Sequence, residues 1–142
     1  MNDNETSEDT GAFATLDEAR AFFAEDRFAT ENAMAIDELD GEHSVTSVAL
    51  SARHRNALGG VMGGVIFTLA DFAFASLTND RRRRTVAQQV SISYLSAPRG
   101  AKLVATARYI KDGRASCVVD IDVVDDTGRA VAQAVTTGFK LR

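Results

Sequence analysis

The sequence is poor in the residues that disulfides and metal sites require. It contains one cysteine, Cys117, so no disulfide can form within the chain. A lone cysteine suits a reducing compartment, and the sequence therefore predicts a cytoplasmic protein. Because the only other soft ligands are two histidines, His43 and His54, we expect no zinc site.

Long hydrophobic runs and an excess of basic residues are lacking as well. No apolar stretch approaches the roughly 20 residues that cross a membrane, so no membrane association is expected. The first residues, MNDNETSEDTG, lack the basic start and apolar segment of a secretory signal. The formal net charge of -4 argues against a nucleic-acid binder, which normally has a strongly basic surface.

What is present fits one domain with a hydrophobic core. The chain has 142 residues, of which 45% are hydrophobic. Residues 1–14 start with an acidic segment and are predicted to form a flexible tail, whereas residues 15–142 form a single domain. Thr15 and Glu18 have the spacing of a capping box, which predicts a helix from residue 16 to about residue 27.

A second helix is predicted over residues 63–78, GGVIFTLADFAFASLT. This segment is apolar on every side and is therefore expected to be buried. Turn signals at Asp40-Gly41, Asp112-Gly113 and 125–128 separate alternating segments, and short links favour antiparallel neighbours. We predict an α+β fold in which a curved antiparallel sheet of about six strands wraps around one long buried helix. The strands are expected near 33–40, 42–51, 86–97, 103–109, 117–123 and 131–141.

Asp71 is the only ionisable residue between Asn56 and Asn79, in the middle of this apolar helix. Burial of a carboxylate is costly and tends to raise its pKa, which makes such a group a candidate base or nucleophile. The alternative is an aspartate at a subunit interface, paired with an arginine or with backbone amides. Position and composition leave both interpretations open.

Gly63 and Gly64 begin the same helix, where the backbone amides lack partners within the helix and the positive end of the dipole lies. Because glycine has no side chain, these amides can approach a carbonyl oxygen that gains negative charge. The alternative is a loop that needs glycine only for a tight turn. Along one helix, residues 63 and 71 are separated by roughly 12 Å.

This separation bears on the oligomeric state. A nucleophile and an oxyanion donor must both lie within about 3–3.5 Å of one reacting group. If Gly63 and Asp71 act on the same carbonyl, they must come from two antiparallel helices. The protein would then be at least a dimer with two equivalent sites.

The segment HRNALGGVMGG at 54–64, followed by FTLAD at 67–71, resembles the motif of hotdog-fold acyl-CoA thioesterases. The family pattern is close to H-x-N-x-x-G-x-x-H-G-G, with an acid eight residues after the first glycine of H-G-G. YLSAPRG at 94–100 also matches, and the resemblance covers residues 33–142. It points to the phenylacetate-degradation (PaaI-like) branch, which includes thioesterase superfamily member 2.

The resemblance implies a role for each matching residue. Asp71 would be the base or nucleophile, the Gly63 amide would polarise the thioester carbonyl, and Asn56 of the other subunit would position the water or the acid. The implied reaction converts a small acyl- or aryl-CoA to acid and CoA without a metal or redox cofactor. The implied assembly is a homodimer as the minimal unit, paired into a homotetramer.

Two positions depart from the family pattern. Met62 stands where a histidine is expected, and a thioether is only a weak hydrogen-bond acceptor. Ala87 stands near the position of a serine or threonine that orients water in some relatives, and Gln88 or Gln89 could substitute for it. We therefore expect reduced or altered activity rather than none.

Further substrate contacts are expected from Met62, Gly64 and His54 within the motif, and from Gln88 and Gln89. His54 is expected to structure the loop rather than to catalyse. Arg82 and Arg84 belong to a basic run at 81–84, which is either a solvated turn or a contact for CoA phosphates, to which arginine is well suited.

Three functions compete. An acyl-CoA thioesterase that uses Asp71 leads, and a non-catalytic acyl-CoA-binding protein is the alternative that Met62 and Ala87 motivate. A hotdog dehydratase or hydratase ranks last, since it needs a histidine paired with an acid and the 63–78 helix contains no histidine.

Overall fold

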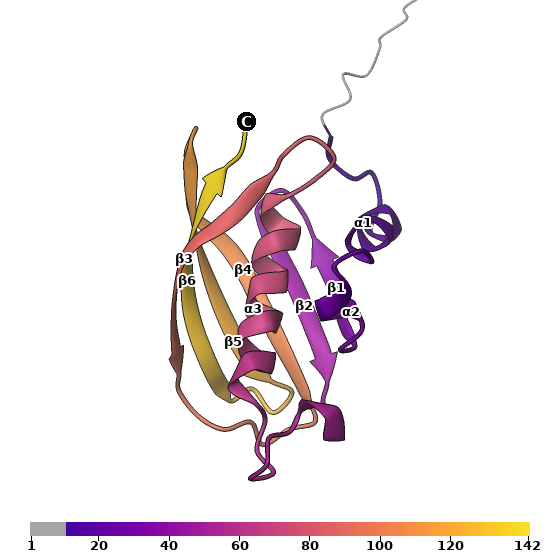
Figure 1. Cartoon of the computed structure of the whole chain (residues 1–142), viewed down its shortest axis with the longest axis vertical. Coiled ribbons are helices and arrows are strands. Elements are labelled where there is room, and N and C mark those ends of the chain that lie inside the picture. The colour runs from indigo at the N-terminus through magenta and orange to yellow at the C-terminus, as the bar shows by residue number, and fades with distance from the viewer. Residues whose placement is uncertain (1–10) are drawn as a thin grey trace, which may run out of the picture.

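A computed structural model of the chain describes residues 11–142 and consists of one curved sheet around one long helix (Figure 1). The six strands are all antiparallel to their neighbours, in the order β1-β2-β4-β5-β6-β3. This arrangement confirms the predicted α+β fold. The elements are α1 Leu16–Phe23, α2 Arg27–Thr30, β1 Met34–Leu39, β2 His43–Ala49, a 3-10 turn at Ala52–His54, α3 Gly63–Thr78, β3 Thr85–Tyr94, β4 Lys102–Asp112, β5 Ser116–Asp125 and β6 Ala130–Lys140.

Each predicted hairpin is present. Asp40-Gly41 joins β1 to β2, Asp112-Gly113 joins β4 to β5, and the 126–129 turn joins β5 to β6. The Asp40 carboxylate caps the first turn by accepting from the amides of Glu42 and His43 at 2.7 Å each. β3 differs, because it pairs with β6 and not with its neighbour in sequence, β4. β3 is therefore an edge strand.

The core lies between the sheet and the buried side of α3. Phe74 packs so closely against β6 that a Cβ atom at Gly138 would lie 2.8 Å from the Phe74 ring and from Cys117 Sγ. Hydroxyl groups that α3 buries are paired, as in the 2.6 Å hydrogen bond between Ser44 and Ser76. Each large apolar side chain buried here contributes about 1.5–3 kcal/mol relative to its exposed state. Fully buried members of this core include Leu69, Leu77, Leu103, Val119, Ile121 and Val123.

The 63–78 helix packs against the sheet as the prediction of a buried helix requires, but the single chain covers only part of it. One face of α3 is covered by the sheet, and the opposite face exposes Met62, Gly64, Phe67 and Asp71. Figure 1 looks onto this open face, with β3 on one side of α3 and α1 and α2 on the other. An apolar helix face open to solvent favours a partner surface.

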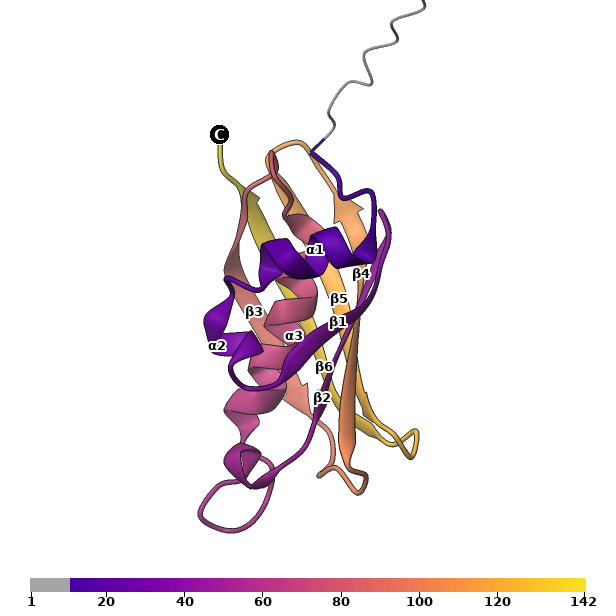
Figure 2. The ribbon, with the colours of Figure 1, turned by 90° about the vertical axis from the view of Figure 1, so that its right-hand side faces the viewer.

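The N-terminal helix is shorter than predicted. α1 ends at Phe23, and α2 begins only at Arg27, so the single helix expected over 16–27 is two helices. The break redirects the chain so that both Phe23 and Ala29 are buried. Thr15 caps α1 as predicted, with its hydroxyl oxygen 3.2 Å from the Glu18 amide. Figure 2 shows that α1 runs across the direction of α3.

Residues 11–14, which the sequence prediction places in the tail, contact the folded domain. The Phe13 ring lies 5.3 Å from the Phe22 ring and 5.8 Å from the Phe23 ring, measured between centroids. Residues 1–10 of the predicted acidic tail lie outside the described residues. Within residues 11–142, no helix has the length and apolarity needed to cross a membrane.

Candidate active site

The first turn of α3 presents backbone amides that no group in the described part of the chain caps. Met62 occupies the N-cap position, and its side chain makes no capping hydrogen bond. Within residues 11–142, no acceptor is bonded to the amides of Gly63 or Gly64. These N–H groups therefore point their partial positive charge at an accessible position on the open face.

Tyr94 lies directly beside this turn. Its hydroxyl donates to the carbonyl oxygen of Gly63 at 3.3 Å, and its ring would lie 3.5 Å from a Cβ atom at that glycine. The tyrosine is the last residue of β3, and 53% of it is exposed. β3 and α3 are thus joined at the end of the helix where the free amides lie.

The loop that leads into α3 is held by Asn56. Its side-chain oxygen accepts from the backbone amides of Leu58 and Gly60 at 3.0 and 3.1 Å, and its backbone amide donates to the carbonyl oxygen of Gly60. Gly59 adopts a φ of 85°, a left-handed conformation that glycine accepts without strain. The side-chain oxygen of Asn56 is therefore occupied within the loop, and its side-chain nitrogen is the group that could contact a ligand.

His54 stabilises the start of the same loop through hydrogen bonds of its buried ring. It is only 1% exposed, and its Nδ1 accepts from the Ser51 amide at 3.0 Å. Its Nε2 lies 2.8 Å from the carbonyl oxygen of Asn32, which requires a proton on Nε2. Both ring nitrogens are engaged, which fits the expectation that His54 structures the loop.

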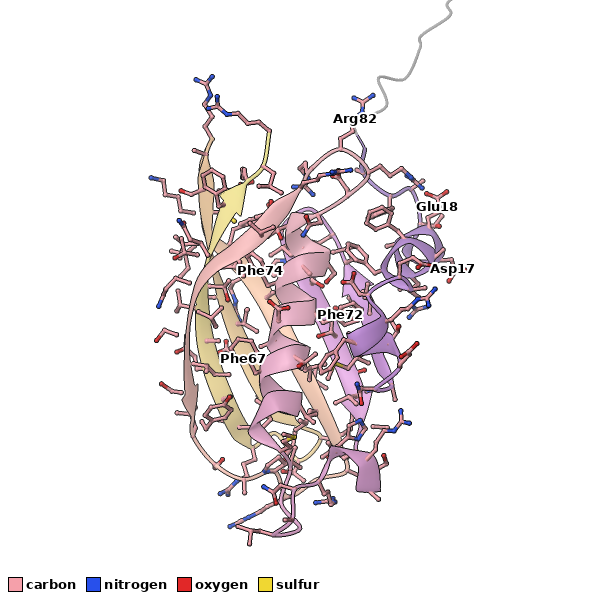
Figure 3. All side chains as sticks on the ribbon, in the orientation of Figure 1. Asp17, Glu18, Phe67, Phe72, Phe74 and Arg82 are labelled. Atoms are coloured by element: carbon pink, nitrogen blue, oxygen red, sulfur yellow. The ribbon has the colours of Figure 1, made fainter. Side chains whose placement is uncertain are left out.

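Asp71 faces a pocket between α2 and α3. The pocket has a volume of about 340 Å³, and Figure 3 shows Phe72, one of its walls, on the side of α3 toward α2. Asp71 makes no hydrogen bond or ion pair with any residue of the described chain. Partial burial in the pocket raises the pKa of Asp71, and the negative charge of Asp26 raises it further. The pocket is lined by Asp26, Arg27, Phe28, Ala29, Thr68, Asp71 and Phe72.

Gly63 and Asp71 do not meet within one chain. Both lie on the open face of α3, but eight residues separate them, which corresponds to about 12 Å along the helix axis. On the open face, the uncapped amides therefore lie at the N-terminal end of α3 and the carboxylate of Asp71 lies near the middle of the helix.

The family can now be identified from the sequence. Residues 58–132, more than half of the chain, match the family model of the thioesterase superfamily. The chain belongs to the thioesterase superfamily. Its curved sheet around α3 is the hotdog fold of that family, and the predicted PaaI-type resemblance is confirmed.

Individual relatives agree with this assignment. The acyl-coenzyme A thioesterase PaaI of Escherichia coli is 30% identical over 115 residues, which cover 80% of this chain and 82% of PaaI. The solved structure of E. coli PaaI matches with a TM-score of 0.77 and 25% identity, over 90% of this chain and 97% of that one. A hypothetical thioesterase protein from Streptococcus pneumoniae, solved with coenzyme A, matches with a TM-score of 0.76 and 27% identity, over 84% of this chain and 96% of that one. The protein is a thioester hydrolase.

The remaining predicted site residues lie away from the first turn of α3, on β3 and in the loop between α3 and β3. Gln88 and Gln89 are exposed on β3, where the register shifts between Ala87 and Gln89. Arg82 and Arg84 follow the C-terminal end of α3, and Figure 3 shows Arg82 at the end of the molecule opposite the 55–62 loop.

The basic run at 81–84 is partly structural. Arg81 lies 3.5 Å from Glu18 and stacks over the Phe13 ring at 5.1 Å. Arg83 donates to the buried carboxylate of Asp80 at 2.6 Å. Arg81 and Arg83 thus stabilise the turn. A contact of Arg82 and Arg84 with CoA phosphates stays a prediction.

Two residues of the candidate site, Tyr94 and Asp26, are not among the site residues predicted from the sequence. Tyr94 begins the YLSAPRG segment that matches the family, but nothing in the sequence placed its side chain beside Gly63. Asp26 falls inside a segment that the sequence predicts as helix, so its place beside Asp71 follows from the break between α1 and α2.

Proposed function

We propose that this thioesterase hydrolyses small acyl- or aryl-CoA thioesters to the free acid and CoA. The observation that carries the proposal is the open face of α3, which holds an unpaired carboxylate, Asp71, and the uncapped amides of Gly63 and Gly64. A base and an oxyanion donor are the two groups that acyl transfer to water requires. The names of the relatives support the substrate class, since PaaI is an acyl-coenzyme A thioesterase and the S. pneumoniae structure contains coenzyme A.

The proposed active unit is a homodimer with two sites at its interface. Gly63 and Asp71 are about 12 Å apart on one helix, whereas both must lie within about 3–3.5 Å of the reacting carbonyl. Two antiparallel copies of α3 would bring Gly63 of one chain to Asp71 of the other. The open face of α3 lies beside the edge strand β3, so helix and strand offer one continuous surface to a second copy (Figure 1). Pairing of two such dimers would give the proposed homotetramer.

In the proposed mechanism, Asp71 removes a proton from a water molecule that attacks the thioester carbonyl, or attacks the carbonyl itself. The oxygen of the tetrahedral intermediate accepts from the Gly63 amide, which the helix dipole makes a better donor. The amide nitrogen of Asn56 from the other subunit positions the water or the carboxylate. Collapse of the intermediate releases the CoA thiolate, and in the first route the thiolate takes up the proton that Asp71 accepted. In the second route the acyl group is left on Asp71 as an anhydride, which water then hydrolyses to the free acid and the Asp71 carboxylate. No residue role here depends on a metal or a redox cofactor.

A substrate panel with Asp71→Asn tests the proposal. Purified protein is assayed for thiol release from a series of acyl- and aryl-CoA esters, and the preferred ester is then used with the variant. Because asparagine matches the shape of aspartate but cannot accept the proton, we expect kcat/KM to fall by about 10²- to 10⁴-fold. Asp17→Asn on the outer side of α1 is the matched control and should match the wild type. Absence of thiol release with every ester, or an active Asp71→Asn variant, would refute the proposal.

A second candidate is a non-catalytic acyl-CoA-binding protein. Met62 favours it, because the residue at the N-cap of α3 offers no strong hydrogen bond to a substrate or a leaving thiolate. Titration calorimetry separates the two functions. Tight binding of a CoA ester without turnover supports the binding protein, and turnover excludes it.

A further inference from the structure

Asp26 stands at the N-cap of α2 but does not cap it. Aspartate at this position commonly accepts a hydrogen bond from an amide of the first helical turn. Here the carboxylate makes no such bond. The Asp26 carbonyl oxygen instead accepts from the amides of Ala29 and Thr30 at 3.1 and 3.0 Å. The side chain is therefore not needed to hold α2.

The Asp26 carboxylate instead shares a pocket with Asp71. Both line the cavity of about 340 Å³ between α2 and α3, with the aromatic walls Phe28 and Phe72. Within residues 11–142, neither carboxylate forms an ion pair with a basic side chain. Two aspartates thus line one partly apolar space without a counter-ion among the described residues. In such a space, a like charge makes the Asp71 proton harder to lose.

Few other charges face this pocket. Arg27 lines it and lies 3.5 Å from Glu25, which offsets its charge. α1 contributes Arg20 to the adjoining pocket that shares Phe72, where its Nε donates to the Ile36 carbonyl oxygen at 2.8 Å and its guanidinium lies 3.6 Å from Asp17.

The remaining elements packed on α3 add no ionisable group to the pocket. Asp37 and Glu38 of β1 do not line it, and the strands behind α3 face the helix with apolar or hydroxyl side chains such as that of Thr46. Asp26 is therefore the one group among the described residues whose charge shares the cavity with Asp71 without a counter-ion.

We propose that Asp26 is a positioning residue for Asp71, whose negative charge across the shared pocket makes Asp71 a stronger base toward the attacking water. This inference rests on the proposed function. Partial burial and then the Asp26 charge raise the pKa of Asp71, and a base with a higher pKa takes up the water proton more readily. Asp26 lies outside every motif of the family pattern. The break between α1 and α2 places it in the same pocket as Asp71.

The test is the pH profile of Asp26→Asn in the full-length protein. This substitution keeps the size of the side chain and removes its charge. We expect the acidic limb of kcat/KM to move to lower pH, kcat on the plateau to fall by about two- to fivefold, and KM to stay unchanged. Asp26→Glu should retain the wild-type limb, as should the control Asp17→Asn, whose side chain is 94% exposed on α1. An unmoved limb in Asp26→Asn would overturn the inference.

A second readout does not require catalysis. The carboxyl carbon of Asp71 is titrated by ¹³C NMR, with its signal assigned from its loss in Asp71→Asn. In Asp26→Asn the Asp71 midpoint should shift to lower pH, and an unchanged midpoint overturns the inference. If the wild type hydrolyses no CoA ester, the proposed function fails, while this titration still decides whether Asp26 acts on Asp71.

Discussion

Met62 is the residue that separates this site from the family pattern. It occupies the N-cap of α3, is 55% exposed and makes no side-chain hydrogen bond. The preceding backbone is held by the Met62 amide, which donates to the His54 carbonyl oxygen at 2.9 Å. Exchange of the exposed side chain should therefore leave the loop intact.

Met62→His is expected to raise kcat of the proposed thioesterase by about tenfold, which corresponds to about 1.4 kcal/mol in the activation barrier. The physical reason is that an imidazole can donate to the substrate or to the leaving thiolate, whereas a thioether cannot. Steady-state kinetics with the preferred CoA ester measure the effect. Met62→Leu serves as the control that changes the side chain without adding a donor. Equal rates for the two variants would show that a histidine contributes nothing here.

At the residue scale, the sequence predicted the part of the site that lies in one contiguous segment. Asp71, Gly63 and Asn56 stand out through spacing and through the lack of other charges around them. Tyr94 and Asp26 did not stand out, because their proximity to α3 depends on strand order and on a helix break. Such long-range contacts leave no periodic signal in the chain.

At the scale of elements, the turn after β5 depends on one carboxylate. Asp125 is 2% exposed, and the Thr127 hydroxyl donates to it at 2.6 Å. The amides of Arg99 and Gly100 donate to its other oxygen at 2.8 and 3.0 Å, and the Arg129 amide donates at 3.0 Å. The Thr127 hydrogen bond, together with these amides and against the effect of burial, holds the pKa of Asp125 well below its usual range. Asp125 therefore joins the β5–β6 turn to the segment before β4.

Asp125→Asn should lower Tm at neutral pH by several degrees, because a neutral amide oxygen accepts these bonds more weakly. The folded-state pKa is lowered, so the ionised group stabilises the fold above about pH 4, its unfolded pKa. This contribution is lost as the pH falls toward the folded-state pKa. Thermal unfolding between pH 3 and pH 7 should show a steeper loss for the wild type than for the variant.

Asp122→Asn on the same strand is the matched control. Its carboxylate forms an exposed pair with Arg108 at 3.1 Å, which contributes little. If both variants lowered Tm equally, the hydrogen bonds of Asp125 would not be the cause of its effect.

Elements themselves were predictable where local chemistry decides them. The three hairpins followed from Asp-Gly and Asp-Asp-Thr-Gly signals, because these residues favour tight turns. The pairing of β3 with β6 could not be predicted. The seven residues between β3 and β4 are too many for a tight hairpin, and their sequence does not show which strand lies next to β3. The apolar pattern of α3 alone also does not show which of its faces the single chain leaves open, because the pattern is the same whether a sheet or a second chain covers the helix.

At the scale of the whole molecule, the proposed dimer makes a quantitative prediction for mixed chains. Gly63→Pro removes the amide hydrogen, and proline is tolerated at the first helical position. The preceding Met62 has φ -64° and ψ 133°, which suits a following proline. A chain with Gly63→Pro and a chain with Asp71→Asn should each be inactive alone. Together they form heterodimers in which one of two sites has both native residues.

Random exchange of the two variants should restore about a quarter of wild-type activity, because half of the dimers are mixed and each has one working site. The measurement is thiol release after the variants are unfolded, mixed and refolded together. Gly63→Pro refolded with wild-type-like Asp17→Asn is the control for refolding yield. No recovery in the mixture of folded variants would show that Gly63 and Asp71 do not act across an interface.

The eight-residue offset between Gly63 and Asp71 also bears on genetics. In the proposed dimer, each site combines residues of two chains, so in one chain a substitution at residue 63 and a substitution at residue 71 affect different sites. Two loss-of-function alleles of this one gene, one altered at codon 63 and one at codon 71, would complement each other in the same cell. A standard complementation test would then assign them to two genes.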